Sequence, residues 1–202
     1  MKKMSDSNHL IGVTTKSNRL IDEAYALAET IYKHDFSSVY ITFGNYAGYG
    51  KYLGQYHPTT QTIEIPIGNK GCVAAITNDG IELDGNAIDL IIHELGHHYE
   101  RHMPIPTFKA GHSTHTRATW CVVCAKGWSY TTGKEIRPER LAQLLKADTK
   151  MAGYMRSFHL SNVPDVDFNY ETPICCNCGK ELINKRADAK YCDAKCKREH
   201  NK

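Results

Sequence analysis

The residues best suited to do chemistry are His93, Glu94 and His97, in the run His93-Glu94-Leu95-Gly96-His97. In an α-helix, residues four apart lie on the same face one turn apart, so both imidazoles can reach one metal ion. Glu94 lies beside that face. We expect it to act as the general base toward a water molecule whose pKa a zinc ion lowers to ~7. The spacing therefore predicts a zinc-dependent peptidase with His93 and His97 as metal ligands.

Three further polar residues follow on the same predicted helix: His98, Glu100 and His102. At about 100° per residue, His98 and His102 lie roughly 140° and 180° around the helix from His93. Glu100 returns to the face of His93 but lies roughly 10 Å further along the axis. None of the three is expected to complete a tetrahedral site, so we expect them to be solvated or to support the ligands indirectly.

The third protein ligand must come from elsewhere, because a catalytic zinc ion keeps one of its four positions for water. The metzincin pattern requires glycine at position 100 and histidine at position 103. This chain has Glu100 and Met103 there, which excludes that class. The downstream candidates are His112 and His115.

A second metal site is predicted near the C-terminus by four cysteines, Cys175, Cys178, Cys192 and Cys196. They form a C-x2-C and a C-x3-C pair, with 13 residues between Cys178 and Cys192. This spacing is typical of a structural zinc site, and Gly179 suits a tight turn after the first pair. Cys176 is the spare thiol. The segment is too short for a packed core, so metal binding must supply its folding free energy.

The same tail is basic. Residues 180–202 contain eight Lys or Arg and four Asp or Glu, a formal charge of +4 within a chain of net charge +3. A zinc ion with four thiolates contributes about −2, which leaves the module modestly positive. Such a charge favours contact with DNA phosphates, with docking to a protein as the rival interpretation.

Hydrophobic periodicity predicts a mixed α+β fold. The expected helices span 18–33, 86–101, 114–126 and 138–146, and the expected strands span 39–43, 51–57 and 61–67, the last two as a hairpin. Pro66 is expected at an edge or at the end of its strand. Cys121 and Cys124 fall within a predicted helix, and we expect them to be buried thiols.

The chain has 202 residues, of which 41% are hydrophobic and 23% charged, the composition of a folded protein. It shows no signal-peptide pattern and no apolar run near the ~18 residues of a membrane span. We therefore expect a cytoplasmic protein with no membrane association. In that reducing compartment, clustered cysteines bind metal more often than they form disulfides.

The chain resembles the SprT-like (Spartan-type) zinc metallopeptidases in three features. These are the order helix, β-hairpin and HExxH helix, the run Ser113-Thr114-His115 followed by Trp120, and the four-cysteine tail. The resemblance covers about residues 18–130 plus the tail. It implies three histidine ligands, a glutamate base, and proteolysis of proteins, often on DNA. We expect a zincin-like catalytic domain over 1–160 and a zinc-ribbon-like or treble-clef-like module over 174–202. Residues 161–173 are polar and acidic with prolines near both ends, and we expect them to be a linker.

Of the two downstream histidines, we predict that His115 is the third ligand. In the resembling family the ligand stands in this Ser-Thr-His context. His115 lies five residues before Trp120 at the expected start of a helix, which Ser113 or Thr114 could cap. His112 lies in an expected mobile loop. However, some family members carry a Gly-His at a shorter spacing from the aromatic residue, which favours His112.

The sequence thus predicts a zinc endopeptidase that acts on a protein substrate and carries two zinc ions, one catalytic and one structural. One alternative is a regulatory protease that cleaves a repressor. Another is a non-catalytic DNA-binding adaptor on a zincin-like scaffold. Glu94 argues against the adaptor, because a scaffold does not need a general base.

Overall fold

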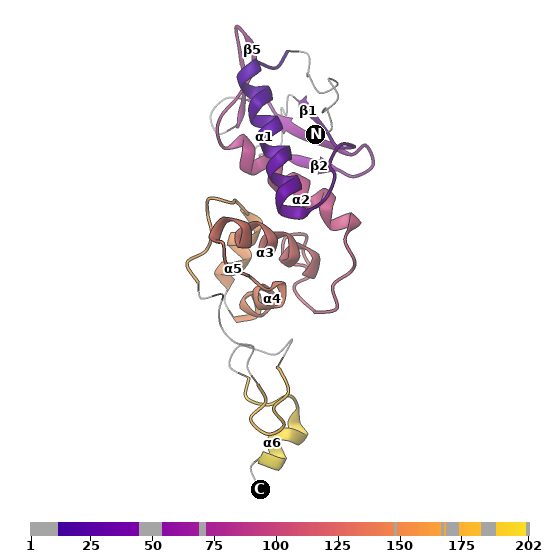
Figure 1. Cartoon of the computed structure of the whole chain (residues 1–202), viewed down its shortest axis with the longest axis vertical. Helices are drawn as coiled ribbons and strands as arrows, with labels where there is room; N and C mark the ends of the chain where they lie inside the picture. Colours follow the sequence, from indigo (N-terminus) through magenta and orange to yellow (C-terminus); the bar gives the residue numbers. More distant parts are fainter. Residues whose placement is uncertain are drawn as a thin grey trace. The chain divides into compact units, whose positions relative to one another are not determined.

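The computed structural model describes residues 12–44, 54–68, 72–147, 149–166, 168, 174–182 and 189–200. Over these residues the chain is a mixed α+β protein, as predicted (Figure 1). It divides into two compact units, Met1–His102 and Met103–Lys202. The predicted domain boundaries at 160 and 174 stay a prediction, and part of the predicted linker 161–173 lies outside the described residues.

The first unit begins with helix α1 (Thr15–Tyr32), three residues earlier than predicted. Thr14 caps its start by accepting a hydrogen bond from the backbone N–H of Ser17 at 3.2 Å. The buried apolar residues recur at spacings of three and four: Ile21, Ala24, Tyr25, Ala28, Ile31 and Tyr32. Lys33 ends the helix in the left-handed conformation, and its N–H bonds to the carbonyl of Glu29.

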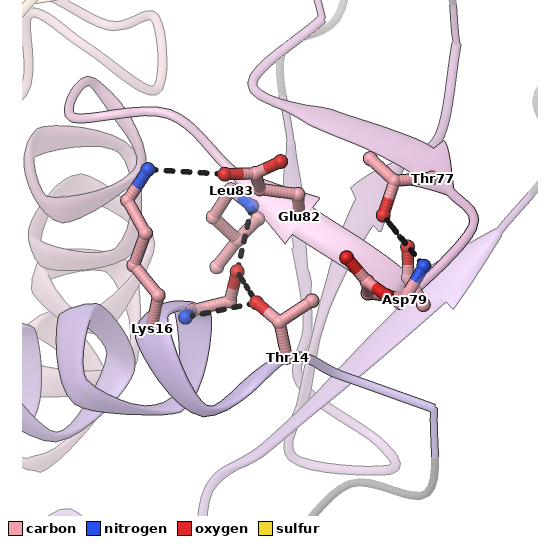
Figure 2. Close-up of polar contacts among 8 residues, drawn as sticks. Thr14, Lys16, Thr77, Asp79, Glu82 and Leu83 are labelled. Carbon is pink, nitrogen blue, oxygen red and sulfur yellow. Dashed lines mark hydrogen bonds and ion pairs between the residues drawn. The ribbon is translucent and has the colours of Figure 1, made fainter.

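The start of α1 is tied to a hairpin that the sequence analysis did not predict, β4 (Ala74–Thr77) and β5 (Gly80–Leu83). The Ser17 hydroxyl accepts a hydrogen bond from the N–H of Leu83 at 2.8 Å, and Lys16 pairs with Glu82 at 3.0 Å (Figure 2). The first of these bonds is buried, so it secures the hairpin to the helix end more firmly than the exposed ion pair does.

Three strands form the other sheet in the order β1-β3-β2. Strand β3 (Thr62–Pro66) pairs in parallel with β1 (Tyr40–Gly44) and antiparallel with β2 (Gln55–His57). The predicted hairpin is therefore confirmed, and Pro66 is the last residue of its strand. Residues 51–53 of the first predicted strand lie outside the described residues. The parallel pairing of β1 with β3 was not foreseen. It leaves β2 at the edge of this sheet, where it packs against α2.

Helix α2 (Ala87–His102) carries the HExxH motif and packs against α1 and the sheet. Its apolar residues Leu90, Ile91, Ile92 and Leu95 are buried, as the stripe predicted. Near its C-terminal end the ring of Tyr99 stacks on Tyr32 of α1, with centroids 5.0 Å apart. Helix α2 is thus enclosed from two sides, which explains why it buries polar residues as well as apolar ones.

The second unit contains three successive helices, α3 (Ala118–Thr132), α4 (Pro138–Ala147) and α5 (Thr149–Arg156). Its core contains Trp120, Trp128, Leu141 and Phe158, all almost fully buried. The indole N–H of Trp120 donates to the carbonyl of Met155 at 2.7 Å. Cys121 and Cys124 are fully buried, which confirms their predicted place. Helix α5 and the later α6 (Ala194–His200) were not predicted.

Candidate active site and metal centres

The centre of the candidate active site is the pair His93 and His97 on α2. Their rings lie one helical turn apart, with centroids 5.0 Å apart and planes at 73° to each other. Both residues are half-buried, so their rings remain accessible at the helix surface. Two imidazoles in this arrangement suit a first-row transition-metal ion such as zinc.

Glu94 is buried on the same helix, with a relative exposure of 5%. One carboxylate oxygen, Oε2, accepts a hydrogen bond from the backbone N–H of Tyr56 at 2.8 Å. Burial raises the pKa of Glu94, while the neighbouring His97, the Tyr56 N–H and His57 act in the opposite direction. A buried carboxyl group with a raised pKa and one fixed hydrogen bond has the character of a proton-transfer group.

Glu100 supports the pair from one turn further along. Its Oε2 lies 3.0 Å from Nδ1 of His97, and its side chain is 2% exposed. A carboxylate bonded to Nδ1 holds the ring in place and leaves Nε2 as the ligand atom, an arrangement common around metal-bound histidines. Glu100 is therefore not solvated, the first of the two roles expected for it, and it contacts the predicted ligand His97.

His98 also differs from one of its expectations, since it is 1% exposed rather than solvated. Its burial, together with nearby His102, His34 and Arg101, lowers the pKa of His98 to about 4. The ring is therefore neutral at physiological pH. Nδ1 of His98 lies 2.8 Å from the hydroxyl of Tyr56, the residue whose N–H reaches Glu94.

The two candidates for a third histidine ligand lie in the second unit, before α3. His115 is half-buried and its ring meets Trp120 edge-on, with centroids 5.1 Å apart. His112 is exposed. The fully buried Trp120 thus gives His115 a fixed support, whereas His112 stands in solvent.

The predicted cap of α3 is wrong. The helix begins at Ala118, and Arg117 is the N-cap residue without a side-chain hydrogen bond. Ser113 instead closes a turn of its own, in which its carbonyl accepts from the N–H groups of Thr116 and Arg117. The reason is that Ser113 and Thr116 bond to each other, with their hydroxyls 2.7 Å apart, and so hold His115 in a turn ahead of the helix.

The four predicted cysteine ligands come together near the C-terminus. The ligand atoms of Cys175, Cys178, Cys192 and Cys196 lie within 4.8 Å of one another. The first pair lies in a turn in which Cys175 N–H donates to the Lys180 carbonyl at 2.8 Å. Gly179 adopts φ +69 in that turn, the conformation for which glycine was expected there. The four-thiol geometry fits a tetrahedral metal ion.

The second cysteine pair lies at the start of α6. Asp193 caps this helix by accepting from the N–H of Cys196 at 2.7 Å. Although burial opposes ionisation, hydrogen bonds from the backbone N–H groups of Cys178, Cys192 and Asn177 lower the pKa of the Cys175 thiol to about 6. Cys176 is exposed and lies outside the cluster. Thiolate ligands that accept backbone N–H bonds are typical of structural metal sites.

Comparison with known protein families, curated proteins and solved structures finds no match to this chain. Among the residues that the structure describes, no helix is both long and apolar enough to cross a membrane.

Two contacts of the site were not predicted from the sequence. The Tyr56 N–H to Glu94 bond joins residues 38 apart and depends on the pairing of a three-residue strand. No local sequence pattern predicts such a contact. The Glu100 to His97 bond did have a signal, because residues three apart face each other on a helix.

Proposed function

We propose that this protein is a zinc-dependent endopeptidase of the SprT-like type, with Glu94 as general base. The observation that carries the proposal is the arrangement on α2, where two adjacent imidazoles accompany a buried carboxylate held by Tyr56. His93 and His97 would hold the metal ion, and the predicted third ligand is His115, whose ring is supported by Trp120.

A zinc ion bound there would supply Lewis-acid polarisation of the scissile carbonyl and would acidify water. The protein residues perform the remaining tasks. Glu94 accepts a proton from the attacking water at its carboxylate and passes it to the departing amine. The Tyr56 N–H keeps the carboxylate oriented during both transfers. Glu100 holds the ring of His97 through Nδ1.

The four-cysteine module would hold a structural zinc ion and dock the enzyme to its substrate. Its α6 helix carries Lys197, Arg198 and His200 in the last turn. Basic side chains at this end also interact favourably with the helix dipole. Lys197 and Arg198 are exposed, as phosphate-contacting residues must be. This surface supports proteins bound to DNA as the substrate class.

The test is a cleavage assay on a DNA-binding protein, with and without DNA, using the full chain and its Glu94→Gln variant. We expect cleavage by the wild type that rises with DNA and stops with a chelator. Cleavage that depends on metal but not on DNA would retain the peptidase and exclude the DNA role. DNA binding without any cleavage would favour the adaptor instead.

A further inference from the structure

A second group of histidines lies in the first unit, away from the pair of the proposed active site. The ligand atoms of His34, His98 and His102 lie within 4.8 Å of one another. The ring centroids are 5.4 Å apart for His34 and His98, 5.2 Å for His34 and His102, and 4.4 Å for His98 and His102. Three imidazoles gathered this closely are a donor set for a first-row transition metal.

Helix geometry explains how α2 can serve two sites. His98 and His102 are spaced like His93 and His97, so each pair presents two rings on one face. At about 100° per residue, the two pairs point to different sides of the helix. The third ring, His34, directly follows Lys33, the C-cap residue of α1 in the left-handed conformation. Helix α1 packs against α2 (Figure 1). The ring of His34 lies beside the second pair and contacts the rings of both His98 and His102.

We propose that His34, His98 and His102 form a second histidine site that binds a divalent first-row transition metal, with Zn²⁺ as the expected ion. Tyr56 supports this site as Glu100 supports His97. Its hydroxyl lies 2.8 Å from Nδ1 of His98, so Nε2 of that ring faces the ion. The ring of His98 is further enclosed by Phe36, with centroids 5.7 Å apart, so its position is fixed.

The three ligand nitrogen atoms must move slightly closer together to bind one ion. Zinc–nitrogen bonds of about 2.0–2.1 Å place the ligand atoms of a tetrahedron roughly 3.3 Å apart. His98 is buried, but His34 is half-buried and His102 is exposed, so the two outer rings can turn toward a shared centre. The charged groups near these rings include Asp35 beside His34 and Arg101 beside His98. Because their charges are opposite, the affinity for the metal ion depends mainly on the three imidazoles. With three ligands and an exposed side, the ion exchanges more readily than one held by four thiolates.

The experiment uses the full chain with His93→Ala and His97→Ala, which removes the pair of the proposed active site. Zinc bound per chain is measured by elemental analysis after equilibrium dialysis over a series of free Zn²⁺ concentrations. We expect two ions at saturation, one on the cysteines and one, more weakly held, on this cluster. X-ray absorption of the second ion should show nitrogen and oxygen neighbours without sulfur.

Adding His34→Ala and His102→Ala should abolish binding of the second ion. The control is His57→Ala, since His57 belongs to the same unit but lies outside the cluster, and this variant should still bind the second ion. If the double substitution impairs folding, the exposed His102→Ala alone should weaken the second ion at least about tenfold. Saturation at one ion, or a second ion that persists unchanged without His34 and His102, would overturn the proposal. Neither result would bear on the active site, because that pair is absent from every protein in the series.

Discussion

The backbone N–H of Tyr56 donates a hydrogen bond of 2.8 Å to Oε2 of Glu94. The edge strand β2 and the helix α2 are thereby joined at the carboxylate that we propose as the general base. The side chain of the same Tyr56 reaches His98, so one strand residue contacts both polar faces of the helix. A buried carboxylate needs such a partner, because an unpaired one costs several kcal/mol, of the order of the desolvation penalty for a single ion.

Replacing Glu94 by Gln should leave the zinc content unchanged. It should reduce the rate of peptide hydrolysis by about 10²–10⁴-fold, the usual contribution of a general base to the rate. Glutamine preserves the size of the side chain and can still accept the Tyr56 hydrogen bond through its amide oxygen. Zinc analysis and a cleavage assay on the same preparation provide the measurement. Full activity in this variant would exclude the mechanism.

Glu100→Gln should weaken zinc at the HExxH pair about 10–100-fold, because the ring of His97 loses its charged partner. Competition with a chromogenic chelator measures the affinity. The matched control is Glu135→Gln, which removes a carboxylate from an exposed position of the second unit. Equal losses in both variants would indicate a general charge effect in place of a positioning role.

His115→Ala should lose the catalytic zinc and the activity, whereas His112→Ala should keep both. The expectation follows from the contact of His115 with Trp120 and from the exposure of His112. Zinc content and cleavage rate are compared for the two variants. The opposite pattern would identify His112 as the ligand.

Removing residues 174–202 should cost one tightly bound zinc ion per chain and leave the remainder folded. The four thiols of this segment form one metal site, and none of them contributes to the histidine groups. Elemental analysis and circular dichroism check the two outcomes. An unchanged zinc content after truncation would refute the four-cysteine assignment.

Gly127→Ala should destabilise the protein by about 1–3 kcal/mol, because a Cβ at this position in α3 would overlap the buried ring of Phe158. The control is Gly153→Ala in α5, where a Cβ meets no atom within 4 Å. Alanine there should stabilise the helix by about 0.5–1 kcal/mol. Denaturant unfolding of both variants measures the difference, and equal stabilities would contradict the predicted overlap.

Many elements followed from local pattern. The helix around the HExxH motif and the hairpin of β2 and β3 were expected, because apolar periodicity is strong in both. The hairpin of β4 and β5 was missed, although Asn78 and Asp79 form its turn and Gly80, the first residue of β5, has φ +120. Its strands have four residues each, too few for alternation to be recognised.

The sequence by itself determined the contacts that depend on a helical turn or a short motif spacing. His93 lies beside His97 because residues four apart share a helix face, and the paired cysteines adjoin for a similar local reason. Only the tertiary structure decided which residues from distant segments join them. Tyr56 reaches Glu94 through strand pairing, and His34 reaches His98 through the packing of two helices. Such contacts depend on the burial of apolar faces, which no local spacing encodes.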